Sequence, residues 1–398
     1  MTPERRAEPA AAPLVPLFDL ELGEEEIAAA TAALRSGWLT MGPRTESFER
    51  AFAEHLGTRH AVALSSCTAA LHLAYLAAGV GPGDEVIVPA ITFVATANAV
   101  RYCGAEPVLA DIAGDHDFGI DPDDVERRIT ERTKAVCAVH YAGYAADLER
   151  LGAICAEHGL VLIEDAAHAP SATPLGSARK LGGIGLAGAF SFFSNKVLSC
   201  GEGGLLATDD DEVAAFARSH RGHALSHDTW DRHRGHAAGY DVVGLGFNDR
   251  IDEPRAALLE ARLAGLEADI ARRRAHVRAY RTALAEIDGI SFPYEDAEVE
   301  VSSCYTMPAL LDEQGQRDPL RQLLRDRHGV QTSVLYPSIH EFTAYAELAG
   351  ERLPRSERLA HAQLTLPLYP HLTEADRDRV VTAVAEGLAE LRGGGGGR

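Results

Sequence analysis

The stretch FSFFSNKVLSCGEGGLLATDD, residues 190–210, places one lysine, Lys196, between two apolar runs. Phe190, Phe192 and Phe193 before the lysine, and the run LLA after the glycines, are both typical of buried strands joined by a turn. A lysine held between buried segments loses hydration, which lowers its pKa and makes the neutral amine available for a Schiff base. A lysine on a solvated surface remains the alternative on this stretch alone.

Composition narrows the classes of function. The 398 residues carry 38 Lys+Arg against 59 Asp+Glu, a net charge of −21, which repels nucleic acids and anionic lipids. Any anionic ligand must therefore be held by local donors. Six cysteines are scattered without paired spacing, which indicates free thiols rather than disulfides or a metal site. No run of 18 apolar residues occurs and the N-terminus lacks a hydrophobic signal core, so we expect a cytoplasmic protein.

Short apolar runs alternate with helical patterns from His60 onward. We expect strands at 60–65, 85–89, 107–112, 134–141 and 160–165, and helices at 68–78, 96–103 and 147–158. Strands that are apolar throughout are buried on both faces, which indicates an α/β fold with a mostly parallel sheet covered by helices. Ligands of such sheets bind at the carboxyl ends of the strands.

Two of these strand ends carry polar groups. Ser65–Ala69 gathers hydroxyls and backbone N–H groups where a strand meets a helix, which suits a phosphate, although a plain helix cap has the same residues. Asp165 ends an apolar strand, where an ionised carboxylate needs a cationic partner such as a protonated pyridine nitrogen. A Schiff-base lysine, a phosphate cup and a carboxylate for a ring nitrogen are together what pyridoxal phosphate requires.

Several longer motifs carry a family resemblance. They are SGWLTMGP (Ser36–Pro43), SSCTAALHL (Ser65–Leu73), GPGDEVIVPAITFVATANAV (Gly81–Val100), IEDAAHA (Ile163–Ala169), FSFFSNK with GEGG, and GLGFNDRIDE (Gly244–Glu253). From about Phe18 to Leu391 the chain resembles the DegT/DnrJ/StrS sugar aminotransferase family, which uses pyridoxal phosphate (PLP) and has the aspartate-aminotransferase-like fold, PLP-transferase type I.

This resemblance implies a large PLP-binding domain with a mostly parallel seven-stranded sheet and a smaller α+β domain. We place a disordered arm at 1–14, the large domain at 15–262, the small domain at 263–392 and a flexible tail at 393–398. A long helix is expected after Asp252. In the small domain we expect strands at 305–311, 330–336 and 364–368, and helices at 319–327 and 374–391.

The resemblance also implies roles for single residues. Lys196 would form the Schiff base with the cofactor and shuttle the proton, and Asp165 would pair with the ring nitrogen. His168, where Gln is commoner, would touch the cofactor hydroxyl, and Phe93 would stack on the ring. The phosphate would be held by Ser66, Cys67, Thr68, Ala69 and Ser191. Asn248 would reach the phosphate from the partner subunit, which implies a homodimer with shared active sites.

Substrate contacts are less determined. In the long segment Gly222–Leu245 we expect Arg232 and Arg234 to hold an anionic part of the substrate, because the net charge of the chain opposes such ligands. Tyr336 and His340 are further candidates. Departures from the family pattern at Asp249 and Leu335 lie in substrate-facing regions. Four histidines of the segment (His223, His227, His233 and His236) lack ligand-like spacing, so we expect no metal.

The expected function is therefore amination of a keto sugar, nucleotide-linked or free, with Glu or Gln as amino donor, in amino-sugar, antibiotic or surface-glycan biosynthesis. A cyclitol (scyllo-inosose-type) aminotransferase or an aminohydroxybenzoate-synthase-like enzyme on the same scaffold remains open. A sugar dehydratase dependent on pyridoxamine phosphate (PMP) would carry His at the lysine position, so Lys196 argues against it. A non-catalytic regulatory protein is the last alternative.

Overall fold

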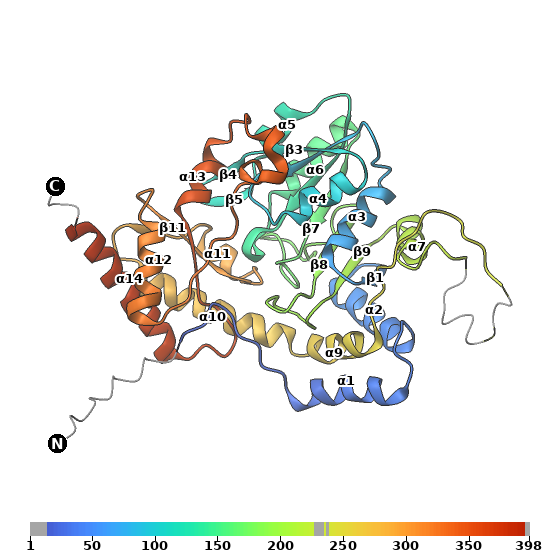
Figure 1. Ribbon diagram of the computed structural model, residues 1–398, viewed down its shortest axis with the longest axis horizontal. Coiled ribbons are helices and arrows are strands. Elements are labelled where there is room, and N and C mark those ends of the chain that lie inside the picture. Colours follow the sequence, from blue (N-terminus) through green and yellow to red (C-terminus); the bar gives the residue numbers. More distant parts are fainter. Residues whose placement is uncertain (1–13, 227–234, 236–238, 395–398) are drawn as a thin grey trace, which may run out of the picture.

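The largest element of the computed structural model, which describes residues 14–226, 235 and 239–394, is a seven-stranded sheet (Figure 1). From edge to edge the order is β1 (His60–Leu64), β9 (Gly204–Thr208), β8 (Ala187–Ser191), β7 (Val161–Asp165), β6 (Thr133–Val139), β2 (Glu85–Pro89) and β3 (Glu106–Ala110). Strand β9 is antiparallel to both of its neighbours, and the other pairs in this sheet are parallel. The predicted α/β fold with a mostly parallel sheet is confirmed.

Helices cover both faces of this sheet. Successive residues of β7 point to opposite sides, so that Leu162 and Ile163 belong to two different hydrophobic clusters. One face packs against α3 (Cys67–Ala77), α4 (Ala95–Tyr102) and α7 (Asp211–His220). The other packs against α2 (Pro43–Leu56) and α6 (Leu148–His158). Burial on both faces explains why these strands are apolar throughout.

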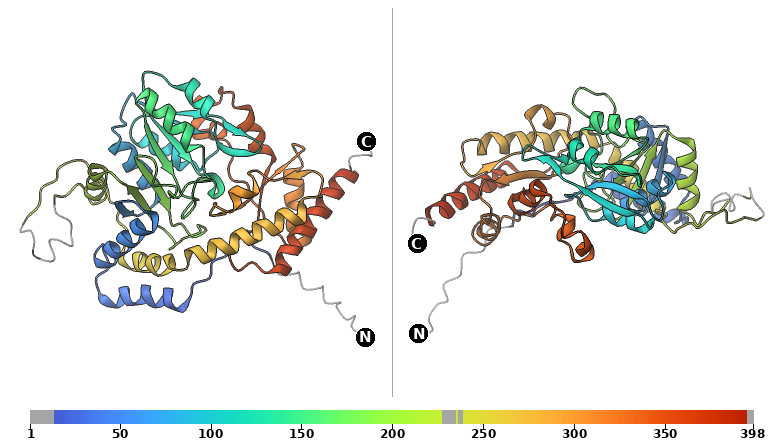
Figure 2. Two further views of the ribbon diagram at one scale, coloured as in Figure 1. Left: turned by 180° about the vertical axis from the view of Figure 1, so that it is seen from behind. Right: turned by 90° about the horizontal axis from the view of Figure 1, so that it is seen from above.

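A second domain is built on a three-stranded antiparallel sheet, β10 (Ile290–Ser291), β11 (Met307–Leu311) and β12 (Gln363–Leu366). Helix α1 (Glu24–Ser36) packs along α9 (Glu253–Leu263), and α10 (Leu266–Leu284) then runs from below the large sheet to this domain (Figures 1 and 2). The domain is completed by the helices α11 (Asp296–Val299), α12 (Arg317–His328), α13 (Pro354–Ala362) and α14 (Glu374–Gly394).

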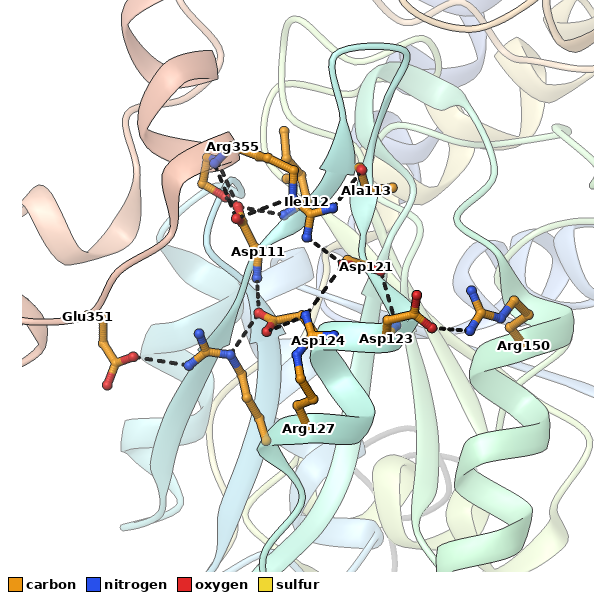
Figure 3. Close-up of polar contacts among 12 residues, drawn as sticks. Asp111, Ile112, Ala113, Asp121, Asp123, Asp124, Arg127, Arg150, Glu351 and Arg355 are labelled. Carbon is orange, nitrogen blue, oxygen red and sulfur yellow. Dashed lines mark hydrogen bonds and ion pairs between the residues drawn. The ribbon is translucent and has the colours of Figure 1, made fainter.

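An ion cluster fastens α13 to the large domain (Figure 3). It lies beside the hairpin β4 (Ile112–Gly114) and β5 (Asp117–Ile120) and the short helix α5 (Pro122–Arg128). Arg355 pairs with Asp111 and Asp121 and donates to the Ala113 carbonyl at 2.9 Å. Asp124 accepts from the Asp111 backbone N–H at 2.7 Å and from Arg128 at 2.8 Å.

Two predicted elements differ from the structure. The segment 330–336 is not a strand, because it makes only isolated bridges, Val330 with Val15 and Ser333 with Thr365. The predicted long helix is two helices, α9 and α10, separated by a turn at Gly265. The hairpin β4–β5, which sequence patterning did not predict, supports the ion cluster.

The domain limits stay a prediction. Their internal boundary, between residues 262 and 263, falls in the last turn of α9. Val15 pairs with Val330, so the start of the predicted large domain lies against the second one. Helix α14 continues to Gly394, into the predicted tail. Residues 1–13 of the predicted arm and 395–398 of the tail lie outside the described residues. No helix in the described part is long and apolar enough to cross a membrane.

Candidate active site

A cavity of about 450 Å³ opens at the carboxyl edge of the large sheet, against the second domain. Its wall is formed by the β1–α3 turn, the end of β7, the connection between β8 and β9, and segments of the second domain near Tyr305 and Tyr336. It brings together most of the predicted site residues, namely Ser66, Cys67, Thr68, Phe93, Asp165, His168, Ser191, Lys196 and Tyr336.

Lys196 lies in a turn after β8, where its N–H donates to the Phe193 carbonyl at 2.8 Å. Its Nζ lies 4.3 Å from the centre of the Tyr305 ring, a cation–π contact. Burial lowers the pKa of Lys196 from 10.5 to about 8, although Asp165 acts in the opposite direction. The amine is therefore far easier to deprotonate than a surface lysine. The expectation that Phe193 is buried was wrong, because it is 43% exposed and lines the cavity.

Asp165 is held at the cavity wall by three donors, of which the Cys67 thiol is the most distant, at 3.9 Å from Oδ1. Oδ2 accepts from Thr96 Oγ1 at 2.8 Å, and Oδ1 accepts from the Ala167 N–H at 3.1 Å. Burial raises the pKa of Asp165, since these hydrogen bonds and the more distant Lys196 compensate it only in part. Within the described residues Asp165 forms no ion pair, so the site lacks a cation in contact with it.

The first turn of α3 forms another part of the cavity wall. Ser66 caps the helix by accepting from the Ala69 N–H at 3.1 Å, so Ala69 contributes to the cap and does not line the cavity. Thr68 and Ser191 line the cavity here, beside the first N–H groups of a helix, which have no partner within the helix. Gly204 at the start of β9 lies so close behind that a Cβ would meet the Ser66 carbonyl carbon at 2.1 Å. A glycine is therefore required where β9 passes behind the turn at Ser66.

Phe93 offers an open aromatic face. It is 55% exposed although it lines the cavity, and its ring centre lies 5.6 Å from that of Tyr336. An exposed phenylalanine inside a cavity has apolar surface that a planar ligand would cover.

His168 is neutral and its proton can be placed. The side chain is buried and stacks on Tyr305 with ring centres 4.4 Å apart, and burial lowers its pKa well below the ordinary value. Nδ1 accepts from the Ala142 N–H at 3.3 Å, so the proton of the neutral ring lies on Nε2. That N–H faces the Tyr336 hydroxyl at 3.0 Å. Tyr336 therefore accepts from His168, and its own O–H is left to donate into the cavity.

Some predicted residues lie elsewhere. His340 is buried away from the cavity, with Nδ1 2.9 Å from Ser338 Oγ and Nε2 3.7 Å from Glu357, a position that favours a structural role. Asn248 is exposed and does not line the cavity of its own chain. Arg232 and Arg234, like the histidines at 227, 233 and 236, lie outside the described residues.

Sequence reasoning missed two residues of this site. Thr96, which holds Asp165, lies one helical turn after Thr92, and its hydroxyl is 2.8 Å from that of Thr92. This i, i+4 pair of threonines could have been noticed in the motif around Phe93. Tyr305, which lies under Lys196 and His168, comes from the second domain, and no local pattern marks it.

Taken together, these groups fit a flat aromatic cofactor that carries a protonated ring nitrogen and a phosphate. Asp165 is a buried carboxylate that lacks a cation, Phe93 has an open face, and the α3 turn presents N–H and hydroxyl donors. Lys196 supplies an amine that lines the same cavity.

The comparisons with known proteins identify the family of the chain. The chain matches the DegT/DnrJ/EryC1/StrS aminotransferase family over residues 20–385. It is 38% identical to the spore coat polysaccharide biosynthesis protein SpsC of Bacillus subtilis over 92% of this chain and 95% of that protein. The crystal structure of the aminotransferase TlmJ from Streptoalloteichus hindustanus superimposes with a TM-score of 0.87 at 35% identity, over 95% of this chain and 100% of that one. That of ntda from Bacillus subtilis with bound cofactor PMP gives 0.83 at 30% identity, over 97% and 87%.

Proposed function

Because the chain belongs to the DegT/DnrJ/EryC1/StrS aminotransferase family and is a sugar aminotransferase that uses pyridoxal phosphate, we propose that it aminates a nucleotide-linked keto sugar with glutamate or glutamine as amino donor. The observation that carries the proposal is the grouping of Lys196, Asp165 and Phe93 around one cavity. Each has a property, namely a lowered pKa, an uncompensated charge or an open ring face, that the fold alone does not require.

In this proposal Phe93 would cover the ring of the cofactor, Asp165 would hold its nitrogen, and the α3 turn with Thr68 and Ser191 would hold its phosphate. Bound pyridoxal phosphate supplies a carbonyl carbon that exchanges the amine and a ring that accepts an electron pair. Asp165 stabilises the protonated ring nitrogen, because burial makes a lone carboxylate there costly. Tyr336 donates a hydrogen bond into the cavity, and His168 orients it.

Lys196 holds the cofactor and moves the proton. A base works best when its pKa lies near the working pH, and a pKa of about 8 gives Lys196 both protonation states near neutrality. The contact with the Tyr305 ring stabilises the ammonium form without neutralising it. Nζ can therefore take a proton at one carbon and return it at another.

Two observations support a nucleotide-linked sugar as the substrate, namely the size of the site and the name of a related protein. A second cavity of about 530 Å³ shares Lys196 with the first, so the site has room for more than the cofactor. SpsC is named for polysaccharide biosynthesis, which supports a sugar as the substrate. A cyclitol ketone is the alternative, because its ring would fit the same space.

We also propose a homodimer in which Asn248 serves the partner's site. Just before Asn248, Val242, Val243 and Leu245 are exposed, and such an apolar row on the surface is typical of an interface. The Asp249 carbonyl accepts from the Ser65 N–H at 2.7 Å, which holds this segment beside the α3 turn. Leu245→Asp should give monomers in analytical ultracentrifugation and weaken cofactor binding, whereas an unchanged dimer would contradict this surface.

The function is tested with purified enzyme, pyridoxal phosphate and L-glutamate or L-glutamine. Nucleotide-linked keto sugars, a free keto sugar and scyllo-inosose serve as acceptors, with the aminated product measured by mass spectrometry. We expect product from a nucleotide-linked keto sugar, abolished by Lys196→Ala and retained by Lys134→Ala, a change at an exposed lysine. Product from scyllo-inosose alone would favour the cyclitol alternative, and no product from any ketone would favour a non-catalytic role.

A further inference from the structure

The second cavity meets the first at Phe18, Asn195 and Lys196, which line both. It is markedly charged. Its basic side chains come from α9, α10 and the segment before α14, and its acidic ones from α10 and the region preceding and beginning α1. They are Arg262, Arg272, Arg273 and His371, and Asp19, Glu21, Glu26 and Asp269.

Two cations that line this cavity, Arg273 and the shared Lys196, form no ion pair among the described residues. Each lining carboxylate lies within 3.8 Å of a basic group other than Arg273: Glu26 with Arg262, Asp269 with Arg272, and both Asp19 and Glu21 with His371. Among the described residues Arg273 makes no ion pair. It is the one lining arginine without an ion pair, and Asp269, the partner of Arg272, offsets the effect of burial on its pKa only in part.

Arg273 is also deeply buried. It is 4% exposed, and its Nη1 donates to the backbone carbonyls of Tyr305 and Leu368, both at 3.2 Å. Its Nε has no hydrogen-bond partner. Burial lowers the pKa of Arg273 to about 10, which is the mark of a cation without an adequate anion. A buried, incompletely bonded guanidinium costs stability unless an anion joins it.

Resting on the proposed function, we propose that Arg273 binds the α-carboxylate of the amino donor. Tyr305 links the two groups involved, since its ring lies under Lys196 Nζ and its carbonyl is held by Arg273. In an α-amino acid the amine and the carboxylate are attached to the same carbon. A donor whose amine reaches the Lys196 position therefore presents its carboxylate to the adjoining wall, where Arg273 lies.

The number of charges favours a carboxylate over the phosphates of a nucleotide. A carboxylate carries one negative charge, which matches the single unpaired arginine of this wall. A diphosphate would bring further negative charges into a cavity that already holds four carboxylates, and like charges at close range repel each other. The sugar nucleotide is therefore expected to extend away from Arg273.

The first test uses the wild-type enzyme and needs no variant. Conversion of the cofactor is followed by absorbance, without keto sugar, for L-glutamate, its α-amide and 4-aminobutyrate, which lacks the α-carboxylate. Loss of a charged hydrogen bond predicts that kcat/KM falls about 10- to 100-fold for both analogues. Equal rates for L-glutamate and its α-amide would overturn the proposal.

The second test is Arg273→Gln, with Arg274→Gln as the control, because Arg274 also binds a backbone carbonyl (Ser302, at 2.7 Å) but does not line the cavity. We expect Arg273→Gln to raise the KM for L-glutamate about 10- to 100-fold, to lose the preference over the α-amide, and to leave the KM for the keto sugar unchanged. A raised KM for the keto sugar alone would overturn the assignment. If the variant does not fold, the wild-type rates with L-glutamate, its α-amide and 4-aminobutyrate still test the role of the α-carboxylate.

These outcomes separate this proposal from the function it rests on. If no amino acid converts the cofactor and no ketone is aminated, the proposed function fails. If transfer proceeds normally but ignores the α-carboxylate, the role of Arg273 alone fails.

Discussion

Two groups of buried charges in this protein differ in whether they have ion-pair partners. In the ion cluster beside α13, the aspartates at 111, 121 and 124 all pair with arginines, and Asp111 also accepts from Ser356 Oγ at 2.6 Å (Figure 3). In the two adjoining cavities, Asp165 and Arg273 are buried just as deeply but form no ion pair among the described residues. The first group is satisfied by the protein itself.

This difference indicates what each group is for. A buried charge that keeps its partners stabilises the fold, and removing one partner is costly. A buried charge without a partner costs stability, and the chain gains from it only when a ligand supplies the opposite charge. Substitutions in the cluster should therefore affect unfolding, and substitutions in the cavity should affect catalysis.

The largest effect is expected for Asp165→Asn. The amide keeps the shape: its oxygen can accept from the Ala167 N–H and its NH2 can donate to the Thr96 hydroxyl, but it cannot stabilise a protonated ring nitrogen. We expect kcat to fall about 1,000-fold, with the free energy of unfolding of the cofactor-free protein unchanged or higher. Steady-state kinetics measures the fall in kcat, and urea unfolding measures the free energy of unfolding. A variant that stays active or is strongly destabilised would contradict the assignment of Asp165 to catalysis rather than to stability.

The converse substitution is Asp111→Asn. The amide nitrogen would replace one of the two oxygens and would face the donors of either Arg355 at Oδ2 or Ser356 at Oδ1, so the free energy of unfolding should fall by about 2–4 kcal/mol. Kinetic constants of the folded enzyme should stay within about twofold, since the cluster does not line the cavity. A loss of activity in the fully folded variant would show that the two groups are coupled.

The pH dependence of cofactor uptake tests whether Lys196 has the lowered pKa expected of a buried lysine. Only the neutral amine of Lys196 attacks a carbonyl, and its pKa of about 8 means that the neutral form grows as pH rises through that value. The rate at which cofactor-free enzyme takes up pyridoxal phosphate should rise about 50-fold from pH 6 to 8 and level off above 9. A rate that keeps rising to pH 10.5 would mean that Lys196 behaves as an exposed lysine.

The smallest effect is expected for Tyr336→Phe. The ring remains, but the hydrogen bond into the cavity is lost, so activity should fall about tenfold and the absorbance of the bound cofactor should shift. Tyr141→Phe is the control, because that hydroxyl donates to Gln363 at 2.6 Å, away from the cavity. If both variants leave the absorbance unchanged, Tyr336 does not donate to the cofactor.

Residues whose roles follow from position along a strand could be predicted from sequence. Asp165 and the Ser65–Ala69 turn stand where apolar strands end, and parallel strands bring such ends to one edge. Lys196 was found because the segments around it are apolar. In each case local pattern determines placement.

What could not be predicted depends on contacts between distant segments. Tyr305 and Arg273 reach the site only because the second domain folds back over the sheet, which no local pattern encodes. The segment 330–336 has a strand-like composition, yet its neighbours offer it only single bridges. Phe193 was expected to be buried like Phe190, but the turn directs it into the cavity.

The most direct test of the central claim is to identify the lysine that binds the cofactor. The chain has three lysines: exposed Lys134, Lys180, whose Nζ donates to the His55 carbonyl at 2.7 Å, and Lys196. Enzyme loaded with pyridoxal phosphate is reduced with borohydride, digested and analysed by peptide mass spectrometry. The account predicts the pyridoxyl group on Lys196, with Asp165→Asn labelled at the same residue. A label on Lys134 or Lys180 instead would contradict it.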